Sequence, residues 1–276
     1  GVSLYLVCAI RSPAQSAGDP MGRTDDYRSI KMSRIHVEDV SFSYEPGMEI
    51  LKHISFDMKE GESVGLIGAN GAGKSTLLKL LVGLNMDYSG TVQVGEYPVS
   101  KQYLPQIRAK LGYVFQDSDS QLFMSTVYED VAFAPRNYGL TADETDQRVR
   151  QALDLTGISH LRDRQIHRLS GGEKKLVSIA TILSMMPEVL LMDEPSIALD
   201  PRNRRSLIHI LNSLDQPKII ASHDLDMIWD TCPRTILLSD GEIVCDGATE
   251  EILCDRELLE SNGLELPLGM QAYDRL

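Results

Sequence analysis

The chain has 276 residues, a hydrophobic content of 42% and a formal net charge of -13. This length allows one large domain with a sizeable core, alone or with an appendage. The acidic balance disfavours a protein that holds nucleic acid through phosphate contacts. No apolar run approaches the roughly 20 residues that span a bilayer, and the four cysteines lack the spacing of a metal site, which indicates free thiols.

The first residues differ from the rest of the chain. Residues 1–10 are apolar but lack a basic leader, and Pro13, Gly18 and Pro20 follow them. This pattern matches neither a complete signal peptide nor an anchor. We expect residues 1–31 to be an extension that is disordered or was added for expression, and Met32 to be a natural start.

The folded part opens with two alternating runs at residues 35–44 and 54–58, separated by the turn-forming residues Glu45, Pro46 and Gly47. Alternation predicts strands, so these runs indicate an antiparallel layer. A short apolar strand at 63–67, a glycine-rich loop and a helix at 76–82 come next. This order is a strand–loop–helix unit.

Short apolar strands and helices alternate through the remainder. The predicted elements are a strand at 111–115, a helical stretch at about 120–165, a helix from Ser170 to Met185, a strand at 189–192, a helix at 204–214, a strand at 218–221 and an antiparallel pair at 235–238 and 242–245. The pattern predicts an α/β fold with a parallel core sheet, an antiparallel β subdomain and an inserted helical subdomain. We place the main domain at 32–247 and an acidic, partly helical extension at 248–276.

The segment Leu169-Ser170-Gly171-Gly172-Glu173 has the pattern of a helix start that can hold an anion. Ser170 and Glu173 form a capping box before an apolar run. Gly171 and Gly172 leave the first turn without side chains, so a phosphate could approach the free N–H groups. Taken alone, the segment favours an ordinary capped helix, because many helices begin with the same Ser-x-x-Glu pattern.

The glycine-rich loop fits the GxxxxGK[ST] pattern of phosphate binding, and it has the strand before it and the helix after it that the pattern requires. Its residues are Gly68, Ala69, Asn70, Gly71, Ala72, Gly73, Lys74, Ser75 and Thr76. Backbone N–H groups would surround the phosphates, Lys74 would reach the β- and γ-phosphates, and the Ser75 hydroxyl would ligate Mg²⁺. The alternative is a simple glycine-rich turn.

Two carboxylates follow the apolar strand at 189–192. Asp193 and Glu194 would stand at the carboxyl edge of the sheet, where α/β folds bind ligands. Asp193 would hold Mg²⁺, directly or through water, and Glu194 could act as general base toward an attacking water. His223 and Gln116 also follow predicted strands, and the Gln116 amide could ligate the metal or water. A lone histidine is more often structural, and neither of these two residues alone establishes a functional role.

Taken together and in this order, these residues resemble an ATP-binding-cassette (ABC) ATPase over about 33–247. The matches are residues 68–76 to the Walker A motif, 189–194 to Walker B, 169–173 to the family signature, Gln116 to the Q-loop, 196–200 to the D-loop, His223 to the switch histidine and Tyr44 to the aromatic residue that stacks on adenine.

The resemblance implies an ATPase that uses ATP and Mg²⁺, with Lys74, Glu194 and His223 as catalytic residues. Two cassettes of this family pack head to tail. Ser170, Gly171 and Gly172 would then face the γ-phosphate bound by a second ABC ATPase subunit, either an identical chain or a paralogue.

Within the family, residues 114–123 and 126–133, with the continuation at 172–175, resemble the ATPases of energy-coupling-factor (ECF) importers. This implies a peripheral protein on the cytoplasmic face of the cell membrane. Its partners would be a transmembrane coupling protein and a substrate-binding membrane protein, and the cargo a metal ion such as cobalt or nickel, or a vitamin.

The rival interpretation is a soluble ABC ATPase that acts on a ribosome, nucleic acid or cofactor assembly. The acidic balance disfavours a nucleic-acid partner, and the chain has one cassette where ABC translation factors have two.

Overall fold

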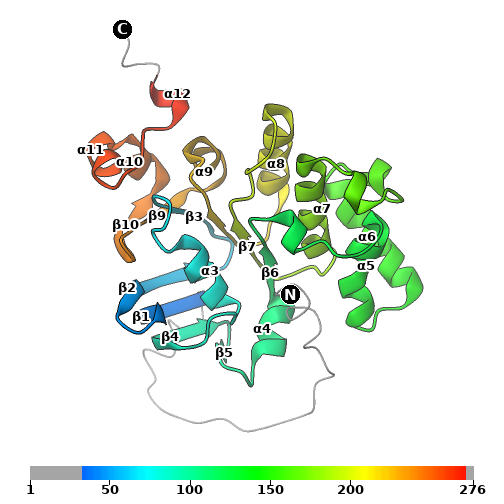
Figure 1. Ribbon diagram of the computed structural model, residues 1–276, viewed down its shortest axis with the longest axis horizontal. Coiled ribbons are helices and arrows are strands. Elements are labelled where there is room, and N and C mark those ends of the chain that lie inside the picture. Colours follow the sequence, from blue (N-terminus) through cyan, green and yellow to red (C-terminus); the bar gives the residue numbers. More distant parts are fainter. Residues whose placement is uncertain (1–32, 272–276) are drawn as a thin grey trace.

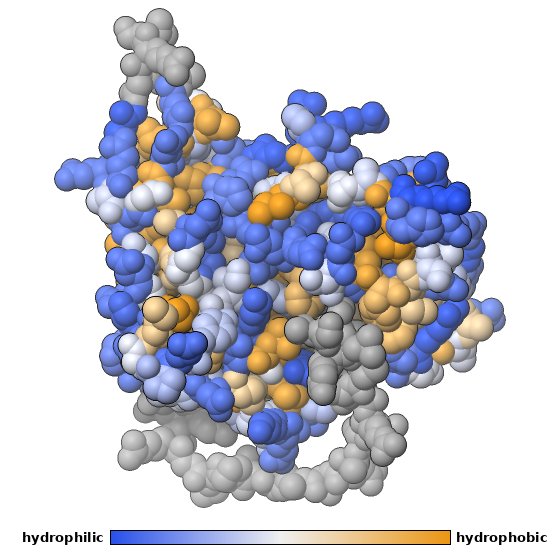
Figure 2. All heavy atoms as spheres, in the orientation of Figure 1, coloured by the Kyte–Doolittle hydropathy of each residue, from blue (hydrophilic) through white to orange (hydrophobic). Residues whose placement is uncertain are grey.

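A computed structural model describes residues 33–271 (Figure 1). The predicted extension at 1–31 and the proposed start at Met32 lie outside this range, as do residues 272–276. Within the described range the chain forms two sheets and a helical unit, which lies beside the strand β6 (Figure 1). Hydrophilic residues cover most of the face in Figure 2, and apolar residues interrupt them in small patches.

The antiparallel layer has four strands in the order β2-β1-β4-β5. Their bounds are Ser33–Glu45 (β1), Met48–Lys59 (β2), Tyr88–Val94 (β4) and Tyr97–Pro98 (β5). The central strand β1 pairs Val37 with Phe56 on one side and with Val92 on the other. These side chains are buried in one hydrophobic cluster together with residues of the larger sheet. The predicted pair of strands is thus half of this layer.

The second sheet has the order β10-β9-β3-β8-β7-β6, in which all neighbours are parallel except β9 and β10. The bounds are Ser63–Ile67 (β3), Leu111–Val114 (β6), Val189–Asp193 (β7), Lys218–Ala221 (β8), Arg234–Ser239 (β9) and Glu242–Ala248 (β10). The strands β6, β7 and β8 are buried along their whole length, so they read as apolar runs without alternation. The α/β fold with a parallel core is confirmed.

Helices connect and cover the strands. The main ones are Lys74–Leu81 (α3), Leu104–Lys110 (α4), Val127–Asn137 (α5), Ala142–Leu155 (α6), Gly171–Leu183 (α7), Pro201–Ser213 (α8) and Leu225–Thr231 (α9). Helices α5 and α6 pack on each other and on α7 (Figure 1). Within residues 33–271, every helix is too short or too polar to cross a bilayer.

Short helices end the described chain: Thr249–Cys254 (α10), Arg256–Ser261 (α11) and Leu268–Gln271 (α12). In Figure 1 they lie at the upper left, above β10 and beside α9. Asp226 of α9 accepts hydrogen bonds from the N–H groups of Leu268 and Gly269, each at 3.0 Å. These two hydrogen bonds attach α12, the last described helix, to α9.

Several elements differ from expectation. The helix α8 begins at Pro201, three residues before the predicted start, because Asp200 caps it by accepting from the N–H groups of Arg202 and Asn203. Strands β4 and β5 and helices α4 and α9 had no predicted counterpart. Strand β4 lacks a clear alternation because a register shift interrupts its pairing with β1, and α4 and α9 are only two turns long.

Candidate functional site

The phosphate-binding pattern lies where strand β3 ends, in the middle of the six-stranded sheet. The loop after Ile67 needs glycine for its backbone, because Gly68, Gly71 and Gly73 all have positive φ angles of 151°, 87° and 108°. A Cβ atom at Gly68 would lie 2.1 Å from the carbonyl oxygen of Leu238. The backbone of this loop thus requires glycine at these positions, as the phosphate-binding pattern does.

Lys74 begins α3 and is buried, with 6% of its surface exposed. Its Nζ donates to the carbonyl oxygens of Gly68 at 2.6 Å and Ala69 at 3.2 Å. Burial lowers the pKa of Lys74, and the negative charges of Glu194 and Asp193 partly oppose this effect. A phosphate at the loop would add an anion where this ammonium group now has only carbonyl partners.

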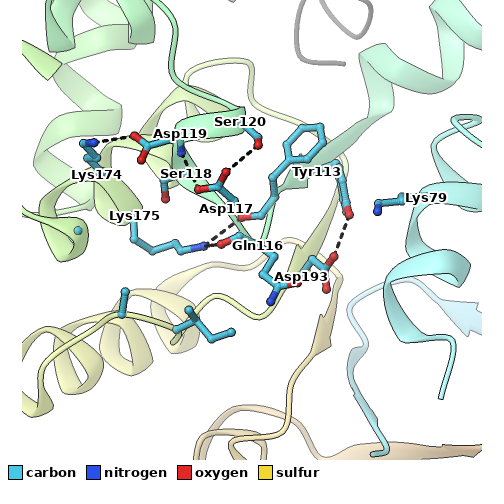
Figure 3. A pocket seen from close by; sticks show the side chains of 14 residues that line it. Lys79, Tyr113, Gln116, Asp117, Ser118, Asp119, Ser120, Lys174, Lys175 and Asp193 are labelled. Atoms are coloured by element: carbon cyan, nitrogen blue, oxygen red, sulfur yellow. Dashed lines mark hydrogen bonds and ion pairs between the residues drawn. The ribbon is translucent and has the colours of Figure 1, made fainter. Parts of the chain in front are cut away.

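Asp193 is the last residue of β7 and joins three elements. Its Oδ1 accepts from the Ser75 hydroxyl at 2.8 Å, and its Oδ2 accepts from the Tyr113 hydroxyl of β6 at 3.1 Å (Figure 3). Burial raises the pKa of Asp193 despite these bonds. The sequence reasoning missed Tyr113. The available signal was a tyrosine within an apolar strand, since a buried hydroxyl needs a partner.

Glu194 has a φ of 48°, in the left-handed region that a glutamate rarely adopts. Its N–H donates to Ala221 at 2.8 Å, which fixes the turn after β7. Its Oε2 lies 2.8 Å from Nδ1 of His223 and accepts from the Ser222 hydroxyl at 3.2 Å. The predicted carboxylate and histidine are therefore in contact at the edge of the sheet. Ser222, which was not predicted, is their third member.

Gln116 lines a cavity of about 490 Å³ next to Asp193 (Figure 3). The segment 115–120 and Tyr113 form one side of this cavity. The other side comes from Gly171, Lys174 and Lys175 of α7 and from Ile197 and Ala198 of the loop before α8. The cavity thus connects the metal-binding candidates with the start of the signature helix.

The signature segment has the predicted capping box. Ser170 accepts from the N–H of Glu173 at 3.3 Å, and Glu173 accepts from the N–H of Ser170 at 2.7 Å. Ser170 and Gly171 are exposed, whereas Gly172 is buried. A Cβ atom at Gly172 would lie 3.0 Å from Nδ2 of Asn203. The structure places this segment across the cavity from Asp193, and Ser170 bonds within its own helix.

Tyr44 lies at the end of β1, beside the phosphate loop. Its ring is 57% exposed and meets the edge of Phe42 with the ring centroids 4.9 Å apart. The hydroxyl is 3.3 Å from Oγ1 of Thr76 and accepts from Nδ2 of Asn85 at 3.2 Å. An exposed aromatic face next to the loop is suited to stacking on a base.

Comparisons with known proteins agree with this geometry. The family described as "ABC transporter" matches residues 51–197. The energy-coupling factor transporter ATP-binding protein EcfA of Methanothermobacter thermautotrophicus is 43% identical over 247 residues, which cover 88% of this chain and 79% of that protein. A provisionally named ABC transporter ATP-binding protein of Geobacter sulfurreducens is 48% identical over 237 residues, 86% of this chain and 95% of the relative.

Solved structures give the same result. That of cbiO1 from Clostridium perfringens, described as part of the ABC transporter complex cbiONQ, has a TM-score of 0.76 at 35% identity and covers 88% of this chain and 99% of that one. The dimeric, post-hydrolysis ATP-binding cassette MJ0796, bound to ADP and Pi, has a TM-score of 0.71 at 26% identity and covers 78% and 98%. With the phosphate loop, the carboxylate pair and the signature helix in place, this chain belongs to the ABC transporter family and is one of its ATP-binding, ATP-hydrolysing subunits.

Proposed function

We propose that the chain is the ATPase of an ECF-type importer that powers uptake of a metal ion, cobalt or nickel, or of a vitamin. The likeness to EcfA and to cbiO1 over nearly the whole described chain carries this proposal. A cobalt or nickel cargo is the first choice, because the sequence resembles the cobalt/nickel branch of these importers and the chain is similar to cbiO1, which is part of the ABC transporter complex cbiONQ.

The side chains at the edge of the sheet have separate tasks in ATP hydrolysis. Lys74 binds the β- and γ-phosphates together with the loop N–H groups. Glu194 accepts the proton of the attacking water, and His223 holds the carboxylate of Glu194 through Nδ1. Tyr44 provides the surface for adenine. Ser222 donates to the same oxygen, Oε2 of Glu194, and restrains it further.

The residues near Asp193 fit a magnesium ion. Ser75 and Asp193 meet at 2.8 Å, and the Gln116 amide lines the same cavity. All three offer oxygen atoms, which Mg²⁺ prefers, and phosphate and water oxygens complete its shell. Bound with ATP, the ion neutralises charge on the β- and γ-phosphates. Residues 33–271 contain no group of three or more His, Cys, Asp or Glu side chains that could hold a metal ion.

A second ABC ATPase subunit completes the site in this proposal. Gly171 is exposed at the positive end of α7 and its N–H could donate to a phosphate, whereas the N–H of Ser170 bonds to Glu173. In this proposal the phosphate is that of a partner, as the resemblance to the head-to-tail cassettes of the family implies. The partner is a copy of this chain or a paralogue, and the dimeric MJ0796 cassette supports such an arrangement.

A narrow apolar groove offers a docking site for the membrane coupling protein. It lies between β6 with α4 and the helices α5 and α7, and its residues include Phe115, Phe123, Phe133, Tyr138 and Met185. The Phe123 ring is 38% exposed and contacts the edge of Phe133. A short amphipathic helix of the coupling protein would bury this surface, and the chain would thereby lie on the cytoplasmic face of the membrane.

Uptake measured with the assembled transporter tests this proposal. The chain is co-expressed with a membrane coupling protein and a cobalt-binding membrane protein, and uptake of radioactive cobalt is measured in cells. We expect ATP-dependent uptake, its loss with Glu194→Gln, and loss of co-purification with Phe123→Asp. Co-purification with ribosomes, combined with no binding to the coupling protein, would favour the soluble ABC ATPase instead.

A further inference from the structure

The segment that contains Gln116 is attached to the signature helix by side chains on both sides of the backbone. We call residues 115–121 the Q segment. Lys175 of α7 donates from Nζ to the carbonyl oxygens of Phe115 at 3.0 Å and Gln116 at 2.7 Å (Figure 3). The N–H of Phe115 donates to Oε1 of Gln121 at 3.1 Å.

Gln121 continues this connection into α7. Its Nε2 donates to the carbonyl oxygen of Ser178 at 2.6 Å and to the Thr181 hydroxyl at 2.8 Å. Both backbone polar groups of Phe115 are therefore connected to α7, through Lys175 on one side and Gln121 on the other. The Q segment cannot shift along α7 without breaking several hydrogen bonds that are buried or partly buried.

Lys175 is an unusual residue for such a place. Only 2% of its surface is exposed, and lysine is rarely buried to this degree. Burial lowers its pKa to about 8, and Asp193, Asp117 and Glu194 oppose that shift. The two bonds of the buried Lys175 ammonium group fix the carbonyl groups of Phe115 and Gln116. These two groups flank the nitrogen and the alpha carbon of Gln116, so the backbone that carries the Gln116 side chain is held in place.

We propose that Lys175 is a positioning residue, which sets the Gln116 carboxamide at the ATP site by holding the Q segment on α7. Ser170 caps the start of the same helix. The unit formed by α7 and the Q segment therefore carries Gln116, which acts on the nucleotide of this chain, and the signature segment, which acts on the nucleotide of the partner. A movement of α7 then moves Gln116 toward or away from Asp193. This inference rests on the role of Gln116 in the proposed function, but not on the importer assignment.

A double-mutant cycle distinguishes a positioning role of Lys175 from a general stabilisation of the fold. Lys175→Met removes the donors while keeping the length of the side chain, and it is combined with Gln116→Ala. For each purified variant we would measure the ATPase kcat, the Mg²⁺ concentration that gives half of maximal activity, and the unfolding temperature. We expect Lys175→Met to lower kcat by roughly tenfold or more, since a displacement of about 1 Å is enough for such a loss. It should also raise the Mg²⁺ requirement.

Two further variants give the controls. Lys175→Arg keeps donors for both carbonyl groups and should retain most of the wild-type kcat. Lys174→Met removes the neighbouring lysine, which joins the same two elements through an exposed ion pair of 2.6 Å with Asp119. Because exposed ion pairs contribute little, its kcat should stay within about twofold of the wild type. If Lys175→Met does not fold, Lys175→Gln replaces it in the cycle.

The outcomes distinguish this inference from the assignment on which it rests. In the Gln116→Ala background, Lys175→Met should cause no further loss of kcat. An equal loss in both backgrounds would overturn the inference, because it would mean that Lys175 acts without Gln116. Wild-type kcat in Lys175→Met would also overturn it. Full activity of Gln116→Ala would instead show that Gln116 itself has been assigned wrongly.

Discussion

The two sides of the large cavity differ in how their polar groups are satisfied. On the side of the sheet, Ser75 and Tyr113 both bond to Asp193, and Glu194 bonds to His223, so almost every group has a partner within the chain. On the side of α7, the N–H and the hydroxyl of Ser170 bond to Glu173 of its own helix. The side of the sheet thus brings together groups from several elements. The side of α7 presents an exposed, capped helix start, as expected for a surface that acts on a second subunit.

The largest expected effect concerns the side of the sheet. Glu194→Gln keeps the shape of the residue but cannot accept a proton, so ATP turnover should fall by roughly 10²–10⁴-fold. Nucleotide binding should remain, and a nucleotide-bound dimer should accumulate. Steady-state ATPase assays and size-exclusion chromatography with ATP would test this. Turnover at the wild-type rate would remove Glu194 as the general base, and Glu60→Gln at an exposed acid is the control.

Lys74→Ala should have its main effect on binding. The loss of a charged hydrogen-bond donor to phosphate costs roughly 1.5–3 kcal/mol, or about 10–100-fold in affinity. Titration calorimetry with ATP would measure this. Unchanged affinity would contradict a phosphate-binding role for the buried lysine.

The chain has two similar capping boxes, and comparing them tests whether the signature segment has a role beyond helix capping. Thr141 and Glu144 form a box at the start of α6 with the same pattern of bonds as Ser170 and Glu173. Ser170→Ala and Thr141→Ala should each lower the free energy of unfolding by about 1 kcal/mol. Only Ser170→Ala should also lower ATPase activity.

Urea unfolding and ATPase assays on both variants measure the two effects separately. If Thr141→Ala lowered activity as much as Ser170→Ala, the effect of Ser170 would be one of helix stability. The signature side would then have no role beyond an ordinary capped helix.

The last prediction concerns stability alone, at Asp130 in the docking groove, outside both sides of the cavity. Burial raises its pKa to about 6, so between about pH 4 and pH 6 the folded chain binds a proton that the unfolded chain releases. Stability therefore falls as the pH rises through this range. Asp130→Asn should remove this fall and add roughly 1–3 kcal/mol at pH 8.

Urea unfolding of wild type and Asp130→Asn at pH 4 and pH 8 would check this expectation. The difference between the two proteins should be small at the lower pH. An equal difference at both values would mean that the effect does not come from ionisation of Asp130.

The sequence predicted those parts of the site whose chemistry requires particular residue types. The phosphate loop needs glycines with positive φ, and Asp193 and Glu194 follow an apolar strand, so both are visible as local patterns. Tyr113, Ser222 and Lys175 were missed because their roles depend on partners 28 to 80 residues away. No local pattern records such contacts.

The fold shows the same division. The buried strands β7 and β8 are continuous apolar runs and were predicted closely. The strand order, with β3 between β8 and β9, joins segments that are far apart in the sequence, and no local pattern records such pairings. Helix α4 has two turns and lacks a side-chain cap, so its start carried little signal.

The buried charges around the cavity have a consequence for folding. Burial disfavours the ionised form of Asp193 and also those of Lys74 and Lys175, so each reduces the stability of the folded chain at neutral pH. Glu194 and Ala198 add backbone strain at positive φ. A phosphate ligand that pairs with Lys74 would offset part of this cost. Nucleotide should therefore act as a folding ligand, whose cellular concentration sets how much of the chain survives heat and proteolysis.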